Sequence, residues 1–165
     1  MTKTKLILAV LFSFFIGGAL IYTLIEKPAA PAVVFSTLTG EKISLDKLRG
    51  KVVLVNFWAT SCPGCIKEMP GMIETYQQYK SKGFEIIAVA MPYDRPDYVL
   101  KFTQARQLPF PVALDIKGEA VAAFGNVTLT PTSFLIGKDG TLIEKKIGEL
   151  DFVKLKATLD QHLGG

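Results

Sequence analysis

The feature that most constrains the fold is the segment Val52–Trp58, an almost unbroken run of β-branched and other apolar residues. A run of this kind is typical of a central strand that is buried on both faces of its sheet. A second such run, Phe84–Ala90, follows a segment with helical spacing of apolar residues at 63–80, which Gly83 ends. Two buried strands with a helix between them predict an α/β fold.

Shorter elements surround this strand–helix–strand unit. A hairpin is expected before it at 33–35 and 43–45, followed by a turn at 46–50. The segments after it alternate in type: a helix at 95–107, a strand at 111–114, a short helix at 119–124, a hairpin at 132–136 and 141–147, and a last helix at 152–163. This order predicts an α/β sandwich with a mixed central sheet.

The amino-terminal segment differs in composition from the rest of the chain. Residues 6–25 carry no charge, and at about 1.5 Å per residue a helix of this length extends about 30 Å, the hydrocarbon thickness of a bilayer. Lys3 and Lys5 precede this run, and basic residues tend to stay on the cytoplasmic side. We therefore expect residues 1–25 to be a single-pass signal anchor in the cytoplasmic membrane, with the rest of the chain in the periplasm or at the cell exterior.

A short tether is expected between the anchor and the folded domain. Residues 26–32 contain two prolines among alanines, a composition typical of a fairly stiff, extended spacer. The domain then occupies residues 33–165. A cleaved signal peptide is the alternative to the anchor, although Ala30-Pro31-Ala32 matches a cleavage site poorly and the apolar run is longer than such signals usually have.

The charge balance excludes one class of partner. The 165 residues include 19 basic and 15 acidic side chains, which give a net charge of +4. Two of the basic side chains belong to the anchor, and the domain contains no basic tract. Nucleic-acid binding through a basic patch is therefore unsupported.

The two cysteines of the chain, Cys62 and Cys65, are separated by Pro63-Gly64 at the point where the buried strand ends and the helix begins. Unpaired N–H groups and the helix dipole at a helix amino terminus stabilise an anion, which lowers the pKa of a thiol there. We expect Cys62 to be the nucleophile and Cys65, one turn further on, to resolve the mixed disulfide that Cys62 forms.

Two other uses of the cysteine pair compete with redox catalysis. A structural disulfide suits an oxidising compartment, but closing so short a loop constrains the unfolded chain little. A zinc or copper site needs three or four ligands, and the single histidine, His162, is far from the cysteines in the sequence. Redox chemistry is the preferred interpretation, with no metal and no cofactor besides the two sulfur atoms.

These motifs resemble the thioredoxin-like superfamily and, within it, the TlpA/ResA type of membrane-anchored, extracytoplasmic thiol-disulfide oxidoreductase. The resemblance covers residues 33–163 and rests on two motifs: Gly50–Thr60 with the two cysteines and Glu68–Pro70, and then Thr130–Ile136 with the Asp139-Gly140 turn. It implies a thioredoxin-like three-layer α/β/α sandwich with a mixed central sheet and an N-terminal β-hairpin.

The resemblance also implies roles for residues outside the cysteine pair. The Thr130-Pro131 bond is expected to be cis and to lie opposite the cysteines, where the Thr130 backbone pairs with a substrate strand; residue type alone favours a trans bond. Glu68 is expected to assist proton transfer at Cys65, because Asn56 stands where cytoplasmic thioredoxins have a buried aspartate. The alternative, without the resemblance, is a glutamate at a solvated position on the helix.

Three further residues are expected to flank the site: Trp58, Pro63 and Gly64. Trp58 lies either beside the cysteines or simply in the core. Ser61 occupies the position where the common pattern has tryptophan, and Gly64 occupies the position where most relatives have proline. The intervening pair tunes thiolate stability, so these departures leave the reduction potential open.

The leading hypothesis is a reductase of protein disulfides that works outside the cytoplasm. The resemblance implies that a membrane electron carrier of the CcdA or DsbD type recharges the cysteine pair. It also implies that the substrate is apocytochrome c, during cytochrome c maturation, or another extracytoplasmic disulfide.

Three alternatives remain. A disulfide-forming oxidase is consistent with Pro63, but the 65 positions from Cys65 to Thr130 leave no room for the inserted helical domain of DsbA-type enzymes. A thiol peroxidase needs threonine or serine three residues before its reactive cysteine and proline seven before, where this chain has Ala59 and Val55. A noncatalytic copper chaperone needs a wider cysteine spacing and a ligand histidine.

Overall fold

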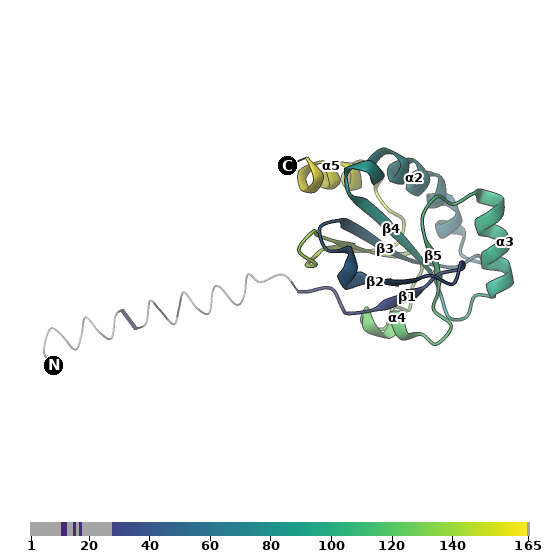
Figure 1. Ribbon diagram of the computed structural model, residues 1–165, viewed down its shortest axis with the longest axis horizontal. Coiled ribbons are helices and arrows are strands. Elements are labelled where there is room, and N and C mark those ends of the chain that lie inside the picture. The colour runs from purple at the N-terminus through teal and green to yellow at the C-terminus, as the bar shows by residue number, and fades with distance from the viewer. Residues whose placement is uncertain (1–10, 13–14, 16, 18–27, 165) are drawn as a thin grey trace, which may run out of the picture.

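The computed structural model describes residues 11–12, 15, 17 and 28–164. Within this part of the chain, the central sheet has five strands in the order β5-β4-β3-β6-β7 (Figure 1). Their bounds are β3 Val52–Trp58, β4 Phe84–Ala90, β5 Val112–Leu114, β6 Thr132–Ile136 and β7 Leu142–Ile147. The β3–β4 and β4–β5 pairs are parallel, whereas β3–β6 and β6–β7 are antiparallel. The prediction of a mixed central sheet is confirmed.

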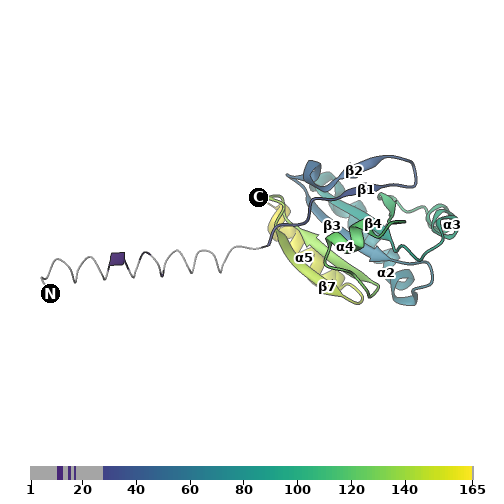
Figure 2. The same ribbon diagram turned by 90° about the horizontal axis from the view of Figure 1, so that it is seen from below.

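Other elements cover both faces of the sheet, but unequally (Figures 1 and 2). One face carries three α-helices: α2 Pro63–Tyr79, which the short 3-10 helix η2 Lys80–Lys82 continues, α3 Pro96–Arg106 and α5 Phe152–Leu163. The other face carries the short helix α4 Glu119–Ala123, the 3-10 helix η1 Leu45–Leu48 and the antiparallel hairpin of β1 Val34–Ser36 and β2 Lys42–Ser44. The expected three layers are present, and the second outer layer is thin.

β3 is buried along its whole length because both faces of the sheet are covered. Its side chains alternate between the two hydrophobic cores: Leu54 and Trp58 pack on the α2 side, and Val55 and Phe57 pack on the α4 side. Asn56 is the one polar residue of the strand, and it is fully buried on the α2 side. The nearly continuous apolar run in the sequence is thus explained, because alternate side chains of β3 pack into the hydrophobic cores on the two faces of the sheet.

α5 packs closely on α2 at Gly71. A Cβ atom at this position would lie 2.6 Å from Cζ and 2.7 Å from Cδ2 of Phe152, which is closer than carbon atoms approach without a shift. The rest of α5 is held by its predicted apolar stripe, formed by Leu155, Leu159 and Leu163. The missing side chain therefore lets α5 begin directly against the helix that carries the cysteines.

The structure corrects a few predicted boundaries. The turn expected at 46–50 belongs in part to the 3-10 helix η1. The helix expected at 95–107 is one residue shorter at each end, because Arg95 is extended and Gln107 adopts a left-handed conformation with a φ angle of 49°. These ends depend on backbone conformations that the apolar pattern does not report.

Part of the predicted tether is attached to the domain. An antiparallel bridge joins Ala29 to Thr141, and the Leu142 N–H donates to the Pro28 carbonyl at 2.8 Å. Among the residues that the structure describes, no helix is long and apolar enough to span a bilayer. The span predicted at 6–25 lies largely outside these residues and stays a prediction.

Candidate active site

Cys62 and Cys65 lie at the junction of β3 and α2 and form a disulfide, with their Cα atoms 5.3 Å apart. Cys62 is the N-cap of α2, and its sulfur accepts a hydrogen bond from the Cys65 N–H at 3.2 Å. Pro63 begins the helix, where its missing N–H leaves no donor unpaired. The sulfur of Cys62 therefore occupies the place where an oxygen of serine or aspartate usually caps a helix.

The two sulfur-bearing residues differ in accessibility. Cys62 is half-buried, whereas Cys65 is fully buried in the core between α2 and the sheet. An incoming disulfide can therefore reach Cys62 and not Cys65. In the dithiol state, the Cys65 N–H and the helix amino terminus would stabilise a thiolate at Cys62.

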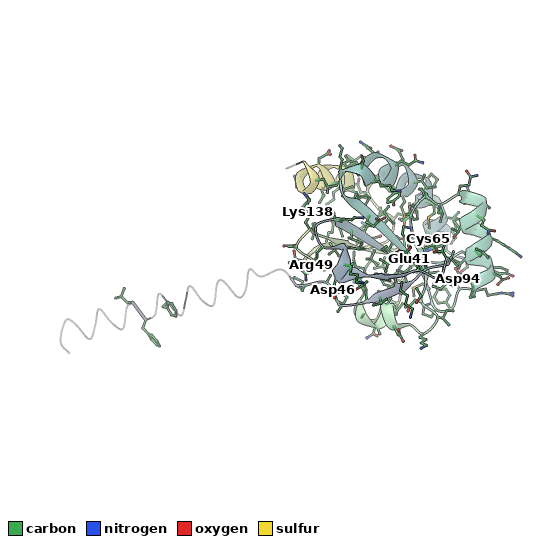
Figure 3. All side chains as sticks on the ribbon, viewed as in Figure 1. Glu41, Asp46, Arg49, Cys65, Asp94 and Lys138 are labelled. Carbon is green, nitrogen blue, oxygen red and sulfur yellow. A yellow bond between two sulfur atoms is a disulfide. The ribbon has the colours of Figure 1, made fainter. Side chains whose placement is uncertain are left out.

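Asp94 fixes the turn that leads into the cysteine pair. Its carboxylate accepts the Thr60 N–H at 2.6 Å and the Thr60 hydroxyl at 2.7 Å, and Figure 3 shows Asp94 on the same side of the domain as Cys65. Asp94 is not among the site residues that the sequence predicts. Since β3 and β4 are parallel, the segments after them meet at one edge of the sheet, and this relation could have identified the residue.

The Thr130-Pro131 peptide bond is cis, as the resemblance implies. Pro131 is buried beside the cysteine motif, since its Cδ atom lies 3.5 Å from the position that a Cβ of Gly64 would take. Its carbonyl accepts the Gly148 N–H at 2.8 Å, which ties the cis segment to the loop after β7. Among residues 28–164, no hydrogen bond to the Thr130 backbone is found, so its N–H and C=O are available to another strand.

Glu68 is not solvated but buried, with 3% of its surface exposed. It lies one turn after Cys65 on α2. One carboxylate oxygen accepts from Nδ2 of Asn56 at 2.9 Å, and the other accepts from the Leu150 N–H at 3.0 Å. The sequence identified Glu68 and Asn56 separately, and the structure brings them into direct contact.

The pKa of Glu68 is raised above its ordinary value of 4.5. Burial is the main cause, because it penalises the charged form. The negative charge of Glu149 adds to this effect, while the hydrogen bonds from Leu150 and Asn56 oppose it. A carboxyl group with a raised pKa takes up and releases a proton closer to neutral pH than an ordinary glutamate does.

The side chain of Asn56 can serve both protonation states of Glu68. Its Nδ2 donates to Glu68 and, at 2.9 Å, to the hydroxyl of Ser133, while its Oδ1 has no partner among the described residues. A rotated amide would present Oδ1 to a protonated Glu68 and to the Ser133 O–H, so both contacts are kept with donors and acceptors exchanged. The NH₂ group would then occupy the place of Oδ1, where no partner is found among the described residues.

A hollow of about 140 Å³ between β6, β7 and α5 lies next to this network. Ser133 and Leu150, which contact Asn56 and Glu68 respectively, both line it. Only a single layer of residues, which includes Leu150, thus separates the carboxyl group of Glu68 from a space that solvent can enter. No local pattern pointed to Ser133 as a partner of Asn56, although it lies in the Thr130–Ile136 motif, or to the Leu150 amide as a partner of Glu68.

Trp58 is fully buried and packs in the same core cluster as Cys65, with its ring 5.2 Å from that of Phe102. It therefore lies in the core, and its expected place beside the cysteines stays a prediction. Ser61, by contrast, is exposed. Among the described residues, no group of three or more histidine, cysteine, aspartate or glutamate side chains is placed to hold a metal ion.

Residues 26–159 match the family model described as Redoxin. Over 175 aligned residues, the chain is 39% identical to the thiol-disulfide oxidoreductase ResA of Bacillus cereus, an alignment that covers 99% of this chain and 97% of that protein. The family model and the alignment with ResA therefore both cover nearly the whole domain.

Two solved structures have the same fold. A thioredoxin-type protein from Neisseria meningitidis is 42% identical with a TM-score of 0.76, and the match covers 83% of this chain and 91% of that one. StoA from Bacillus subtilis is 32% identical with a TM-score of 0.68, and the match covers 79% of this chain and 98% of that one.

Proposed function

This chain belongs to the Redoxin family and is a thiol-disulfide oxidoreductase, and we propose that it acts as a reductase of protein disulfides outside the cytoplasm. The observation that carries the proposal is the asymmetry of the cysteine pair. An accessible sulfur caps the helix at Cys62, while Cys65 is buried one turn before a carboxyl group with a raised pKa. This arrangement separates the attacking group from the resolving group.

In the first step, the Cys62 thiolate attacks one sulfur of a substrate disulfide. The substrate S–S bond breaks, its second sulfur leaves as a thiolate, and a mixed disulfide joins Cys62 to the substrate. The substrate chain lies along the free Thr130 backbone opposite the cysteines, as a strand added to an open edge. Pro131 holds this segment against the motif.

In the second step, Cys65 attacks the sulfur of Cys62 and releases the second substrate thiolate. The Cys62–Cys65 bond forms, so the substrate has gained two electrons and the enzyme has lost two. Cys65 must lose its proton before it attacks, and Glu68 is the proton acceptor because it is the buried carboxylate one turn away. The proton then leaves Glu68 for solvent in the hollow beside it, which is lined by Leu150, the residue whose N–H contacts the Glu68 carboxylate.

The oxidised pair must be reduced again before another turnover. We propose that a membrane dithiol carrier of the CcdA or DsbD type supplies the electrons, and that residues 6–25 anchor the chain in that membrane. The support is the length and apolar character of this segment, with Lys3 and Lys5 before it. Apocytochrome c, or another disulfide exposed outside the cytoplasm, is the proposed substrate.

The alternative direction is disulfide formation, which Pro63 favours. Against it, the chain between β4 and β6 holds only α3, β5 and α4, so the described part contains no inserted helical domain over the site. The reduction potential of the cysteine pair separates the two directions. Equilibration of the purified domain with a dithiol–disulfide buffer should give a value near that of thioredoxin, about −270 mV, and not near that of DsbA, about −120 mV. A value at the oxidising end would contradict the reductase proposal.

The location has its own test. Alkaline phosphatase fused after the last residue is expected to be active, because this reporter folds only where disulfides form. Washing membranes with alkaline carbonate should leave the fusion protein in the membrane fraction. Recovery of the protein in the soluble fraction would contradict the anchor.

A further inference from the structure

Glu149 lies in the loop between β7 and α5, and this loop is fixed to the active site on both sides of the residue. The Gly148 N–H donates to the carbonyl of Pro131 at 2.8 Å, and the Leu150 N–H donates to Glu68 at 3.0 Å. Glu149 stands between these two bonds. Its position relative to the cysteine motif is therefore set by the backbone and does not depend on its own side chain.

The Glu149 side chain faces Gly64, the second residue between the cysteines. A Cβ atom at Gly64 would lie 3.5 Å from Cγ and Oε1 of Glu149 and 3.5 Å from Cδ of Pro131. A Cβ there would be in ordinary van der Waals contact with these atoms, so the missing side chain leaves a recess of about one carbon atom between the cysteine motif, the cis-proline and the Glu149 carboxylate. The carboxylate itself stays partly exposed beside this recess.

Glu149 forms an ion pair with Lys67 that contributes little free energy. Lys67 Nζ lies 2.8 Å from Oε2, but the two side chains keep 74% and 44% of their surface exposed. Exposed ion pairs of this kind contribute little, because water screens them and two flexible side chains must be ordered. A cation supplied by a substrate can therefore displace Lys67.

We propose that Glu149 and the recess at Gly64 form a subsite for a basic side chain next to the reactive cysteine of the substrate. The inference rests on the proposed function, in which the substrate lies along Thr130 with its cysteine at Cys62. Paired strands lie about 4.8 Å apart, and a long basic side chain close to that cysteine can span such a distance to the Glu149 carboxylate. Arginine suits the Glu149 carboxylate better than lysine does, because its planar guanidinium can bind a carboxylate through two hydrogen bonds.

The test uses disulfide peptides that are identical except for one residue beside the cysteine, which is arginine, glutamine or glutamate. The wild-type domain should reduce the arginine peptide with a kcat/KM roughly three- to tenfold above that of the glutamine peptide, and the glutamate peptide more slowly than either. Added salt should shrink these differences, because it screens the pair. Glu149→Gln should make the three rates nearly equal.

Two further variants complete the design. Glu74→Gln removes another exposed, ion-paired glutamate of similar environment, at the far end of α2, and should keep the wild-type order of the peptides. Lys67→Gln removes the competing cation and should widen the preference for arginine. If Glu149→Gln instead slows all three peptides by the same factor, the residue acts on the cysteines and the subsite is excluded. If the wild-type domain reduces no peptide, the reductase function fails, and the subsite with it.

Discussion

The amide of Asn56 donates to the carboxylate of Glu68 across 2.9 Å and thereby joins the central strand to the helix that carries both cysteines. Asn56 is fully buried, and Glu68 is nearly so. A buried polar contact of this kind is costly to leave unsatisfied, so its two members should respond to substitution as a unit.

The two cysteines are expected to give different phenotypes. Cys62→Ser should abolish reduction of insulin disulfides, because the accessible nucleophile is lost. Cys65→Ser should accumulate a mixed disulfide with substrate, since the first step proceeds and the second cannot. Turbidity of reduced insulin measures the first effect, and intact mass measured without reductant detects the second. A double serine variant that keeps wild-type turnover would contradict the catalytic assignment.

Glu68→Gln should slow the resolving step about 10²-fold at neutral pH and remove its dependence on a group with a raised carboxyl pKa. The glutamine can stay hydrogen-bonded, because a rotated Asn56 amide accepts from its NH₂ while its oxygen accepts from Leu150. Release of a chromophoric thiol from a preformed mixed disulfide, followed over a pH series, measures this step. Glu74→Gln is the matched control on the same helix. An unchanged profile in Glu68→Gln would show that another group takes the proton.

Glu68 should also make stability depend on pH. Its pKa is raised above 4.5 in the folded chain, so the folded state holds this proton more tightly than the unfolded state does. The resulting stabilisation is complete below the unfolded pKa and is lost as the pH rises through the folded pKa. Thermal melts of the oxidised domain should therefore show a larger fall in Tm above pH 4.5 for wild type than for Glu68→Gln. Parallel curves would contradict the raised pKa.

Asn56→Asp should place a second carboxylate against Glu68. Two buried carboxylates at this distance cannot both ionise without a large cost, so the pair should retain one proton. We expect a loss of about 3 kcal/mol or more in the free energy of unfolding at about pH 8, and a much smaller loss at acid pH. Urea titrations at both pH values measure the difference. Adding Glu68→Gln should recover most of the loss, since its NH₂ can donate to the new carboxylate; a double variant as unstable as Asn56→Asp would exclude charge repulsion.

Gly71→Ala should destabilise the domain although alanine favours helices by about 1 kcal/mol over glycine. The new methyl group would overlap the ring of Phe152, and overpacking of this kind costs about 1–3 kcal/mol. In a Phe152→Ala background the ring is absent, so the same substitution should become neutral or stabilising. Urea titration of the wild type, the two single variants and the double variant gives the coupling energy between positions 71 and 152. Equal effects in both backgrounds would exclude the contact with Phe152 as the cause.

Much of the fold could be predicted from the sequence because its central elements carry unambiguous patterns. The strands β3, β4 and β6 begin and end at the predicted residues, since each is a mostly buried run rich in strand-forming residues and bounded by turn residues. Helix ends were less accurate because they depend on single backbone conformations, as at Gln107. The thin second layer carries no such strong pattern, so the sequence predicts only its hairpin and short helix and not the 3-10 helix η1.

The site was predicted only in part, for a physical reason. Cys62 and Cys65 are close in the chain, so spacing and helix position identify them. The partners of Glu68 are not close: the Leu150 amide lies 82 positions away and is a backbone group that no side-chain pattern reports. Ser133 meets Asn56 only because β6 pairs with β3 in that register. Such contacts follow from topology, which local patterns do not contain.

The attachment of Ala30 to Gly140 determines which way the domain faces. This hydrogen bond, 2.9 Å long, lies beside the beginning of β3, whereas the cysteines follow its end; in Figure 3, Arg49 and Lys138 mark the first end and Cys65 the second. A strand of seven residues separates the two ends by roughly 20 Å. The chain thus enters the domain at the end of the sheet that is opposite the disulfide. If residues 6–25 anchor the chain as proposed, the cysteines lie on the end of the domain that is away from the anchor. A dithiol donor in the same membrane must then either extend outward by that distance, or meet a domain that has rotated so that its cysteines face the membrane.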